Sequence, residues 1–322
     1  MSGDRPPAIS RRDALKLGIG TGVVLTLGHN DAFASLPAWW QSGALIERAI
    51  PSTGEKLPVI GMGTAINYQA PKTAADLAPL TEVLKKFPEL GGRVLDTAPS
   101  YGEAEVVVGN ALAELKNRDK YFLATKVSVG RGGGDRAAAA AQMENSLKRL
   151  KTDRIDLMQI WNVSNPELLV PLLDEWKAAK RIRYTGITSS SKGQYPELEA
   201  TIKAHKFDFV QIDLAIDNRS SQERIIPLAA DRGMGVLINL PFGRTRVFQK
   251  VLGKPLPDFA KEIDATSWAQ IFLKYIVSNP AVTAAMPGTE KVQFLVDNMG
   301  AAHGRLPDTA MRKKIEAYFD AL

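Results

Sequence analysis

The stretch Arg93-Val-Leu-Asp-Thr-Ala-Pro-Ser-Tyr101 begins as an apolar run and then turns polar. A second stretch of the same kind is Phe122-Leu-Ala-Thr-Lys126. Short continuous apolar runs are typical of strands in a parallel sheet that is covered on both faces. If these two strands are parallel neighbours, Asp96, Tyr101 and Lys126 converge at one rim of the sheet, because both strands end on the same side.

Outward from these two strands, strand-like and helix-like segments alternate along the chain. The strand-like runs are 59–63, 93–98, 121–127, 155–161, 183–188, 207–215, 235–241 and 282–287. The segments with helical spacing of apolar residues are 73–87, 104–116, 137–150, 167–179, 195–204, 222–232 and 268–277. Eight strands in strand-helix alternation predict an α/β protein of the (β/α)8 (TIM) barrel type. A doubly wound open sheet is the alternative, but it would have fewer strands and a glycine-rich first turn.

The ends of this repeating pattern have their own signatures. Residues 44–60 contain two short strand patterns separated by Ser52-Thr53-Gly54-Glu55, a turn composition that predicts an N-terminal β-hairpin. A final helix is expected over 308–322, covering an outer face. No linker or change of composition divides the chain after the first 34 residues, so we predict one domain over residues 35–322.

Residues 1–34 are interpreted as an export signal. They contain the pair Arg11-Arg12, an uncharged apolar run over 17–27 and then Ala32-Phe33-Ala34. This order of basic, apolar and small residues is that of a cleavable signal, and the paired arginines resemble the twin-arginine type. We expect recognition by the twin-arginine export machinery, cleavage near Ala34 and a periplasmic or secreted bacterial protein. A disordered basic tail and an uncleaved anchor are the alternatives.

The composition excludes several classes of function. The chain of 322 residues has no cysteine, which rules out disulfides, thiolate catalysis and Cys-ligated zinc. Its formal net charge of +6 comes from charges that are interspersed along the sequence, so nucleic-acid binding is not indicated. No spacing of His, Asp and Glu residues suggests a metal site, and none is expected.

The three ionisable residues at the rim, Asp96, Tyr101 and Lys126, are of types that together can transfer a proton. A phenol is a weak acid with an ordinary pKa of about 10, and an adjacent ammonium group favours its deprotonated form. A carboxylate beside the lysine would keep it charged and aimed. The alternative is that Asp96 caps a helix, Tyr101 packs and Lys126 is solvated at a strand end. That alternative fits any one of these residues better than it fits all three at matching strand ends.

The chain resembles the aldo/keto reductases over residues 44–320. The resemblance rests on the order and spacing of these motifs: Gly61-Met-Gly-Thr64, Asp96-Thr-Ala-Pro-Ser-Tyr101, Thr125-Lys126, Ile155-Asp-Leu-Met-Gln-Ile160, Gly186-Ile-Thr-Ser189, Val210-Gln211, Met286-Pro-Gly-Thr289 and Asp297-Asn298. It implies an oxidoreductase that uses NADP or NAD to reduce a small-molecule carbonyl substrate, an aldehyde or ketone, to an alcohol. Tyr101 would protonate the carbonyl oxygen, and Lys126 and Asp96 would tune and hold Tyr101.

The resemblance also assigns residues to the cofactor. Asn162, Ser189 and Gln211 fall where the family binds the nicotinamide carboxamide. The segment 287–298 matches the part that holds the adenosine phosphate and the adenine. The expected cofactor-binding residues are Gly63, Thr64, Asn162, Ser189, Gln211, Pro241, Gly243, Arg244, Pro287, Gly288, Thr289, Lys291, Asp297 and Asn298.

Three positions depart from the family pattern. Trp161 occupies the place of the fourth catalytic residue, a His; its indole can donate one hydrogen bond but cannot shuttle a proton. Leu214 occupies the place of the aromatic that stacks on the nicotinamide. Phe294 occupies the place of the Arg that grips a 2′-phosphate, with Glu290 and Lys291 nearby, so the choice between NADP and NAD stays open.

These departures keep a second interpretation open, because a fold does not by itself fix a function. The chain would then be a noncatalytic cofactor- or ligand-binding protein on the same barrel. The trio of Asp96, Tyr101 and Lys126 favours the enzyme. In either case we expect a monomer or a small homo-oligomer, because no coiled-coil pattern or extended apolar helix argues for a larger assembly.

Overall fold

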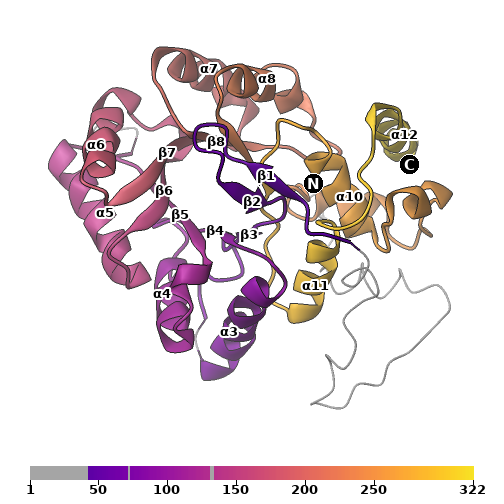
Figure 1. The fold of residues 1–322 in the computed structure, drawn as a ribbon, viewed down its shortest axis with the longest axis horizontal. Coiled ribbons are helices and arrows are strands. Elements are labelled where there is room, and N and C mark those ends of the chain that lie inside the picture. Colours follow the sequence, from indigo (N-terminus) through magenta and orange to yellow (C-terminus); the bar gives the residue numbers. More distant parts are fainter. Residues whose placement is uncertain (1–42, 72, 131–133) are drawn as a thin grey trace, which may run out of the picture.

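The protein forms a barrel of parallel strands inside a ring of helices in the computed structural model, which describes residues 43–71, 73–130 and 134–322 (Figure 1). The export signal expected over 1–34 lies outside the described residues. The barrel strands are β3 (Met62–Gly63), β4 (Val94–Asp96), β5 (Phe122–Val127), β6 (Ile155–Ile160), β7 (Ile182–Thr188), β8 (Phe209–Asp213), β9 (Gly235–Asn239) and β10 (Ala284–Ala285). They form one sheet in the order β10-β9-β8-β7-β6-β5-β4-β3, and every pairing is parallel.

The two edge strands of this sheet, β3 and β10, come together and close the barrel. Parallel bridges join Ile60 to Ala285 and Gly63 to Gly288. The Gly61 amide donates to the Ala285 carbonyl at 2.9 Å, and the Gly63 amide donates to the Pro287 carbonyl at 3.2 Å. The predicted (β/α)8 barrel is therefore confirmed.

The helices that cover the barrel begin where the sequence supplies capping residues. Asp135 caps the helix that follows β5, and Asn165, followed by a proline, caps the helix that follows β6. The helices are α3 (Ala74–Glu89), α4 (Ala104–Leu115), α5 (Arg136–Leu150), α6 (Pro166–Ala178), α7 (Tyr195–Ala204), α8 (Ile225–Asp231), α9 (Arg246–Lys250), α10 (Trp268–Val277), α11 (Val292–Gly300) and α12 (Thr309–Asp320). Within the described part of the chain, none of the helices has the length and apolar character needed to cross a membrane.

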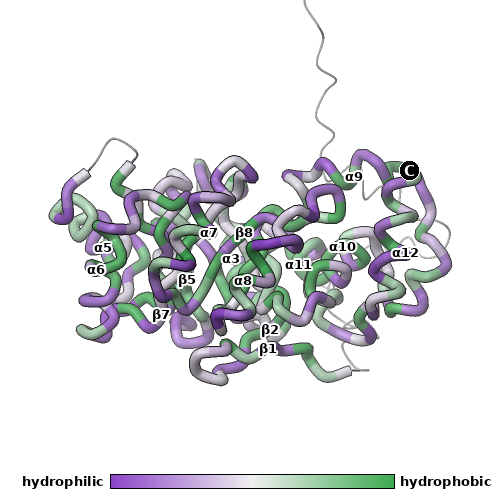
Figure 2. The backbone as a smooth tube through the Cα atoms, turned by 90° about the horizontal axis from the view of Figure 1, so that it is seen from above, coloured by the Kyte–Doolittle hydropathy of each residue, from purple (hydrophilic) through white to green (hydrophobic). Residues whose placement is uncertain are grey.

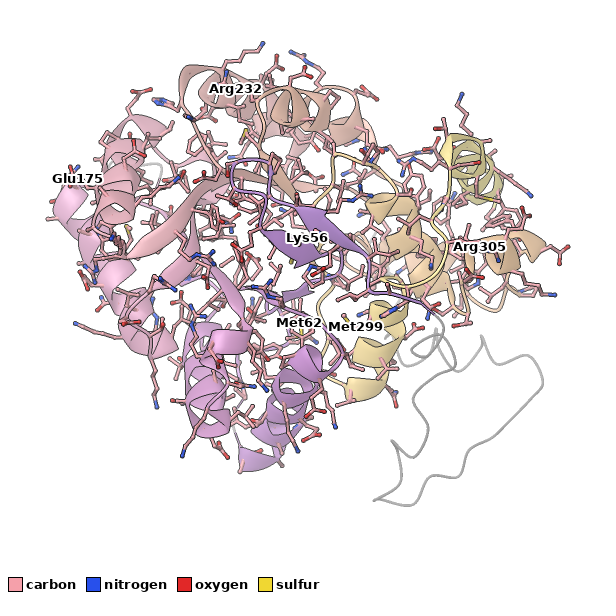
Figure 3. The ribbon with its side chains drawn as sticks, in the orientation of Figure 1. Lys56, Met62, Glu175, Arg232, Met299 and Arg305 are labelled. Carbon is pink, nitrogen blue, oxygen red and sulfur yellow. The ribbon has the colours of Figure 1, made fainter. Side chains whose placement is uncertain are left out.

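The predicted hairpin is present and lies at the end of the barrel where the strands begin. Its antiparallel strands are β1 (Glu47–Ala49) and β2 (Lys56–Pro58). In Figure 2 the hairpin lies at the opposite edge of the molecule from α9, and in Figure 3 Lys56 lies over the middle of the ring of helices. Ile50 and Leu57 are fully buried there and pack with the apolar residues of the barrel interior. The hairpin thus closes the amino end of the barrel.

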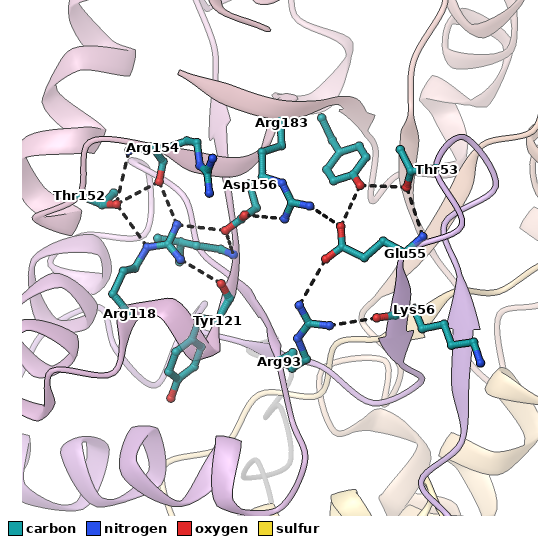
Figure 4. Close-up of polar contacts among 12 residues, drawn as sticks. Thr53, Glu55, Lys56, Arg93, Arg118, Tyr121, Thr152, Arg154, Asp156 and Arg183 are labelled. Carbon is teal, nitrogen blue, oxygen red and sulfur yellow. Dashed lines mark hydrogen bonds and ion pairs between the residues drawn. The ribbon is translucent and has the colours of Figure 1, made fainter. Parts of the chain in front are cut away.

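A network of charged side chains joins the hairpin to the strands beneath it (Figure 4). The Glu55 carboxylate, in the hairpin turn, accepts hydrogen bonds from Arg93 and from Arg183. Arg183 also donates to Asp156 at 2.9 Å, and Arg118 donates to the other oxygen of Asp156 at 3.0 Å. These contacts connect residues that are up to 128 positions apart in the sequence.

The barrel interior has an apolar lower layer and a polar upper layer. The lower layer consists of buried hydrophobic residues, namely Ile50, Leu57, Val94, Phe122, Ala124, Leu157, Tyr184, Phe209, Leu237, Ala284 and Met286. Farther along the same strands come Asp96, Lys126, Gln159 and Gln211, all buried. Because parallel strands all end on one side, these polar residues meet near the carboxyl end of the barrel, where TIM barrels hold their active sites.

Candidate active site

The buried pair of Asp96 and Lys126 is the electrostatic centre of the carboxyl end. The Lys126 Nζ lies 2.8 Å from each Asp96 carboxylate oxygen, and it also donates to the Thr97 carbonyl at 2.9 Å. Burial, the strongest influence, lowers the pKa of Lys126. The Asp96 carboxylate and the Tyr101 hydroxyl outweigh it together, so the pKa of Lys126 ends above its ordinary value. Lys126 is therefore a charged ammonium group near neutral pH.

Tyr101 lies in the turn that leads from β4 into α4, and this turn brings it to the lysine. The Lys126 Nζ is 5.1 Å from the centre of the Tyr101 ring. The next residue, Gly102, has a positive φ of 53°, and a Cβ on it would lie 2.4 Å from the Gln69 carbonyl oxygen. Only glycine fits this close approach of two loops. The structure thus brings together the three residues that the sequence placed at matching strand ends.

A cleft with a volume of about 760 Å³ opens above this group. Asp96, Tyr101, Lys126 and Trp161 all line it. The expected cofactor residues that line it are Gly63, Asn162, Gln211, Pro241, Arg244, Pro287, Gly288, Thr289 and Lys291. The cleft is therefore shared by Asp96, Tyr101, Lys126 and most of the residues expected to hold a cofactor.

Five of the expected cofactor residues do not line the cleft. The Thr64 hydroxyl donates to the Asp96 carbonyl at 3.1 Å, and the Ser189 hydroxyl donates to the Gln194 side chain at 3.0 Å. Asp297 accepts hydrogen bonds from two side chains of the α10 region. The residues outside the lining are Thr64, Ser189, Gly243, Asp297 and Asn298. A direct role toward a cofactor stays a prediction for these five residues.

The polar groups on the floor of the cleft fit a carboxamide. Gln211 and Asn239 both line the cleft. Among the described residues, the buried Gln211 Nε2 has no acceptor and the buried Asn239 Oδ1 has no donor. A carboxamide presents the complementary acceptor and donors. Asn239 was not among the residues predicted from the sequence; the signal for it was a polar residue that ends the run 235–238.

Trp161 and Ile66 make the mouth of the cleft apolar. Trp161 begins a short 3-10 turn at the end of β6, in which Asn162 and Val163 both have left-handed backbones, with φ of 50° and 55°. Ile66 is 63% exposed and has a φ of 75°. Left-handed backbones are costly for β-branched residues, and such strain tends to occur at functional sites. Ile66 could not be predicted as part of the site, because isoleucine is not a residue that favours a positive φ.

The structure does not replace the missing histidine. His205 forms a hydrogen bond with Glu167 at 2.9 Å, and His303 does so with the Gly43 carbonyl at 3.1 Å. No histidine in residues 43–71, 73–130 or 134–322 lines the cleft. Leu214, which the family pattern places beside the nicotinamide, is fully buried in the core and does not line the cleft either.

Charged residues mark the other end of the cleft. Arg244, Lys291 and Glu290 line it, and Glu290 accepts a hydrogen bond from Asn67 at 3.1 Å. Gly288 passes close to the opposite loop: a Cβ on it would lie 3.2 Å from the Gly63 carbonyl oxygen. Two cations beside a closely approaching backbone suit an anionic ligand. No metal-binding cluster of His, Asp or Glu occurs in the described part of the chain.

Two curated proteins illustrate the similarity of the sequence. Aldo-keto reductase YhdN of Bacillus subtilis (strain 168) is 31% identical over 205 residues, which are 59% of this chain and 60% of YhdN. The chain thus spans less than two thirds of that relative. Methylglyoxal reductase YeaE of Escherichia coli (strain K12) is 27% identical over 278 residues, covering 84% of this chain and 95% of YeaE.

Solved structures and a family profile extend the comparison. An aldo-keto reductase from Klebsiella pneumoniae in complex with NADPH superposes with a TM-score of 0.71 at 22% identity, covering 86% of this chain and 96% of that one. The holo form of an aldo-keto reductase from Bacillus halodurans gives a TM-score of 0.68 at 21% identity, covering 85% and 96%. These two share the fold. The profile of the Aldo/keto reductase family matches residues 59–318, most of the sequence, and with this match the chain belongs to the aldo/keto reductase family.

Proposed function

We propose that the protein is an NAD(P)-dependent oxidoreductase that reduces a small aldehyde or ketone to an alcohol. The observation that carries the proposal is the Lys126 ammonium, bound to both oxygens of Asp96 and 5.1 Å from the Tyr101 ring at the floor of a cleft. Membership of the aldo/keto reductases supports it. So do the relatives, of which one is a methylglyoxal reductase and others are solved with NADP or NADPH.

The roles of the side chains follow from their contacts. A nicotinamide cofactor held in the cleft would supply the hydride for the carbonyl carbon. Tyr101, at the cleft surface, gives its hydroxyl proton to the carbonyl oxygen. The phenolate that remains is stabilised by the nearby Lys126 ammonium, and Asp96 holds that ammonium in place and charged. The pair works by electrostatic preorganisation, because both charges are in position before the reaction begins.

The cofactor would be held at both ends of the cleft. Gln211 and Asn239 would bind the carboxamide of the nicotinamide through their unpartnered amide atoms. Arg244 and Lys291 would neutralise the phosphates. Glu290 opposes an additional phosphate in the same region, so we expect NAD to bind at least as tightly as NADP. Fluorescence titrations with NADH and NADPH test this expectation.

A second function is favoured by Trp161, which lines the cleft where a proton-transferring histidine would be expected. An indole cannot exchange a proton with a substrate near neutral pH. On this alternative the protein binds a nicotinamide cofactor or another ligand without turnover. The alternative uses the same cleft and differs from the enzyme in the absence of hydride transfer.

A comparison of wild type with Tyr101→Phe separates the two functions. The substitution removes the hydroxyl that carries the proton and leaves the ring. We expect both proteins to bind the reduced cofactor, and only the wild type to reduce small aldehydes such as methylglyoxal at a substantial rate. Binding in both without turnover in either indicates the noncatalytic protein, and equal turnover in both excludes Tyr101 as the acid.

The proposal includes export and the boundary of the mature domain. Residues 1–34 would direct the chain to the twin-arginine machinery, and residues 35–322 would act outside the cytoplasm as a monomer or small homo-oligomer. A signal with Arg11→Lys and Arg12→Lys should keep the precursor in the cytoplasm. Fractionation of wild-type and altered chains tests the signal, N-terminal sequencing of the exported form tests cleavage near Ala34, and size-exclusion chromatography tests the oligomeric state.

A further inference from the structure

Gln159 contacts Asp96, the partner of Lys126, but does not line the cleft. Its side chain is fully buried on β6, and the cleft lining does not include it. Its Nε2 donates a hydrogen bond to the Asp96 Oδ1 at 3.2 Å. On the neighbouring strand β5, Lys126 is the residue in register with it. Gln159 is therefore the second side chain that binds the carboxylate on which Lys126 depends.

On the side of Gln159 away from β5, the neighbouring strand β7 has a glycine instead of a side chain. Gly186 on β7 is in register with Gln159. A Cβ at Gly186 would lie 3.0 Å from the Gln159 Cγ and 3.2 Å from the Leu157 Cδ1. These distances are shorter than ordinary van der Waals contact. The Gln159 side chain is thus confined between β5 and a strand position without a side chain.

The geometry explains what a second donor does for Asp96. The Lys126 Nζ is equidistant from the two carboxylate oxygens, at 2.8 Å, an arrangement that depends on the rotation of the carboxylate plane. That torsion is soft in aspartate, because rotation about a bond to an sp² carbon has broad minima. A second donor that binds only Oδ1, as the Gln159 amide does, fixes the plane of the Asp96 carboxylate. An amide NH2 suits this task because it can only donate to a carboxylate.

We propose that Gln159 is a positioning residue for the reaction: its amide fixes the Asp96 carboxylate and, through it, the place of the Lys126 ammonium beside Tyr101. The proposal rests on the proposed carbonyl reduction. Gln159 touches neither substrate nor cofactor, so its removal should lower kcat and leave KM for both nearly unchanged.

Two substitutions at this position give opposite pH behaviour. Gln159→Met keeps the length of the side chain and removes the donor, and we expect kcat to fall roughly tenfold or more at every pH. Gln159→Glu is isosteric. The titratable groups facing it are Asp96 from β4 and Lys126 from β5, with Tyr101 beyond them, and β7 presents Gly186. While protonated, the new carboxyl can donate to Asp96. Once ionised, it repels Asp96 and binds the lysine in its place.

We therefore expect the kcat of Gln159→Glu to recover toward the wild-type value at low pH. The ratio of kcat for Gln159→Glu to that of wild type should be near one at low pH and should fall as the pH rises. The ratio for Gln159→Met should stay flat. Gly186→Ala disturbs the same side chain without changing its chemistry, and it should also lower kcat with little change in KM. Urea unfolding of each variant shows whether the protein is folded under the assay conditions.

A second measurement does not need turnover. The absorbance of the Tyr101 phenolate is obtained by subtracting the alkaline titration of Tyr101→Phe from that of the parent protein. Its midpoint should lie at higher pH in Gln159→Met than in wild type, because this variant adds no charge and no longer holds the Lys126 ammonium, through Asp96, beside Tyr101. If wild type reduces carbonyls while the folded Gln159 variants keep its kcat and pH profile, the inference is overturned and the enzyme remains. If wild type shows no turnover, the proposed function fails, and an unchanged phenolate midpoint then rejects the positioning role as well.

Discussion

At the scale of single residues, the Lys126 ammonium is closely held by its surroundings. Its Nζ has three acceptors within 2.9 Å, and the side chain is almost completely buried. A buried charge is tolerable only while its partner is present, because an uncompensated charge in the interior is costly. The contact between Lys126 and Asp96 therefore has to be kept for the fold, and on the proposed function the same contact serves the reaction.

This double role predicts the effect of Lys126→Met. The substitution leaves the Asp96 carboxylate buried without its cation, and we expect a loss of about 3–5 kcal/mol in the free energy of unfolding together with loss of carbonyl reduction. Urea denaturation and initial rates measure the two effects. The double variant Lys126→Met with Asp96→Asn removes both charges and should recover part of the stability but none of the activity. Equal stability of the single and double variants would contradict the argument.

Gly102 provides a second test at this scale. Gly102→Ala places a Cβ 2.4 Å from the Gln69 carbonyl oxygen, so the turn that carries Tyr101 must shift. We expect roughly a tenfold or larger fall in kcat, because small displacements of catalytic groups are costly. Gly54→Ala in the hairpin turn is the matched control, since that glycine also has a positive φ, of 74°, but open space around it. It should lower stability by about 1 kcal/mol and leave kcat unchanged.

The residues of the site could be predicted to different extents. Asp96 and Lys126 could be predicted, because each comes at the end of an apolar run and parallel strands end on one side. Tyr101 could be predicted with them, because it follows Asp96 by five residues in the turn after the strand. Gln159 lies within its apolar run, and its contact with Asp96 spans 63 positions of sequence, so only the register of the strands reveals it. The strained backbone at Ile66 had no signal at all.

At the scale of elements, the hairpin turn carries a charged contact that joins β1 and β2 to the barrel. Glu55 accepts hydrogen bonds from Arg93 and Arg183, and the Tyr184 hydroxyl donates to it at 2.8 Å. Glu55→Gln keeps the shape and removes the charge. Because the ion pairs are partly exposed, we expect a loss of about 1 kcal/mol in the free energy of unfolding, with kcat unchanged at the opposite end of the barrel.

The outer helices supply the control for this prediction. Glu175 pairs with Arg136 between α6 and α5, and Figure 3 shows Glu175 at the periphery of the molecule. Its side chain is 63% exposed, so Glu175→Gln should change stability very little. Thermal unfolding of both variants provides the comparison. A larger effect at Glu175 than at Glu55 would contradict the structural role of the hairpin contact.

The elements themselves were largely predictable, and the exceptions have physical reasons. The helices α5, α6, α7 and α10 lie within one or two residues of their expected positions, because capping residues and helical periodicity agree there. The last strand, expected over 282–287, is reduced to β10 over Ala284–Ala285; Pro287 has no amide hydrogen and cannot extend the strand as a donor at its carboxyl end. The helices α9 and α11 were not predicted: α9 has only five residues, and no helical segment was expected directly after the last strand, where α11 lies.

At the scale of the whole molecule, Lys274 joins α10 to the connection that leads to the C-terminal helix. It is fully buried and donates hydrogen bonds to the carbonyls of His303 and Arg305. Burial lowers the pKa of Lys274 to about 8, with Arg305 acting in the same direction and Asp264 opposing it. The ordinary pKa of the unfolded chain is 10.5. The unfolded state therefore binds this proton more tightly than the folded state does.

This difference predicts a stability that rises with pH. Between pH 8 and 10.5 the folded protein has released the Lys274 proton while the unfolded chain still holds it, so the free energy of unfolding should increase with pH through this window. Below pH 8 Lys274 is protonated in both states, so it no longer makes the free energy of unfolding depend on pH. Urea titrations at several pH values from 7 to 10 should show the rise in wild type and its absence in Lys274→Met. An equal slope in both proteins would assign the effect to other groups.

The hairpin closure and the cleft lie at opposite ends of one barrel, and this separation has a practical consequence. A protein engineer can change the loops around Trp161 and Ile66 for new substrates while the ion-pair network of Glu55, Arg183 and Asp156 at the other end of the barrel stays intact. Libraries confined to the rim should therefore retain a high share of folded members, which makes this chain a suitable scaffold for directed evolution.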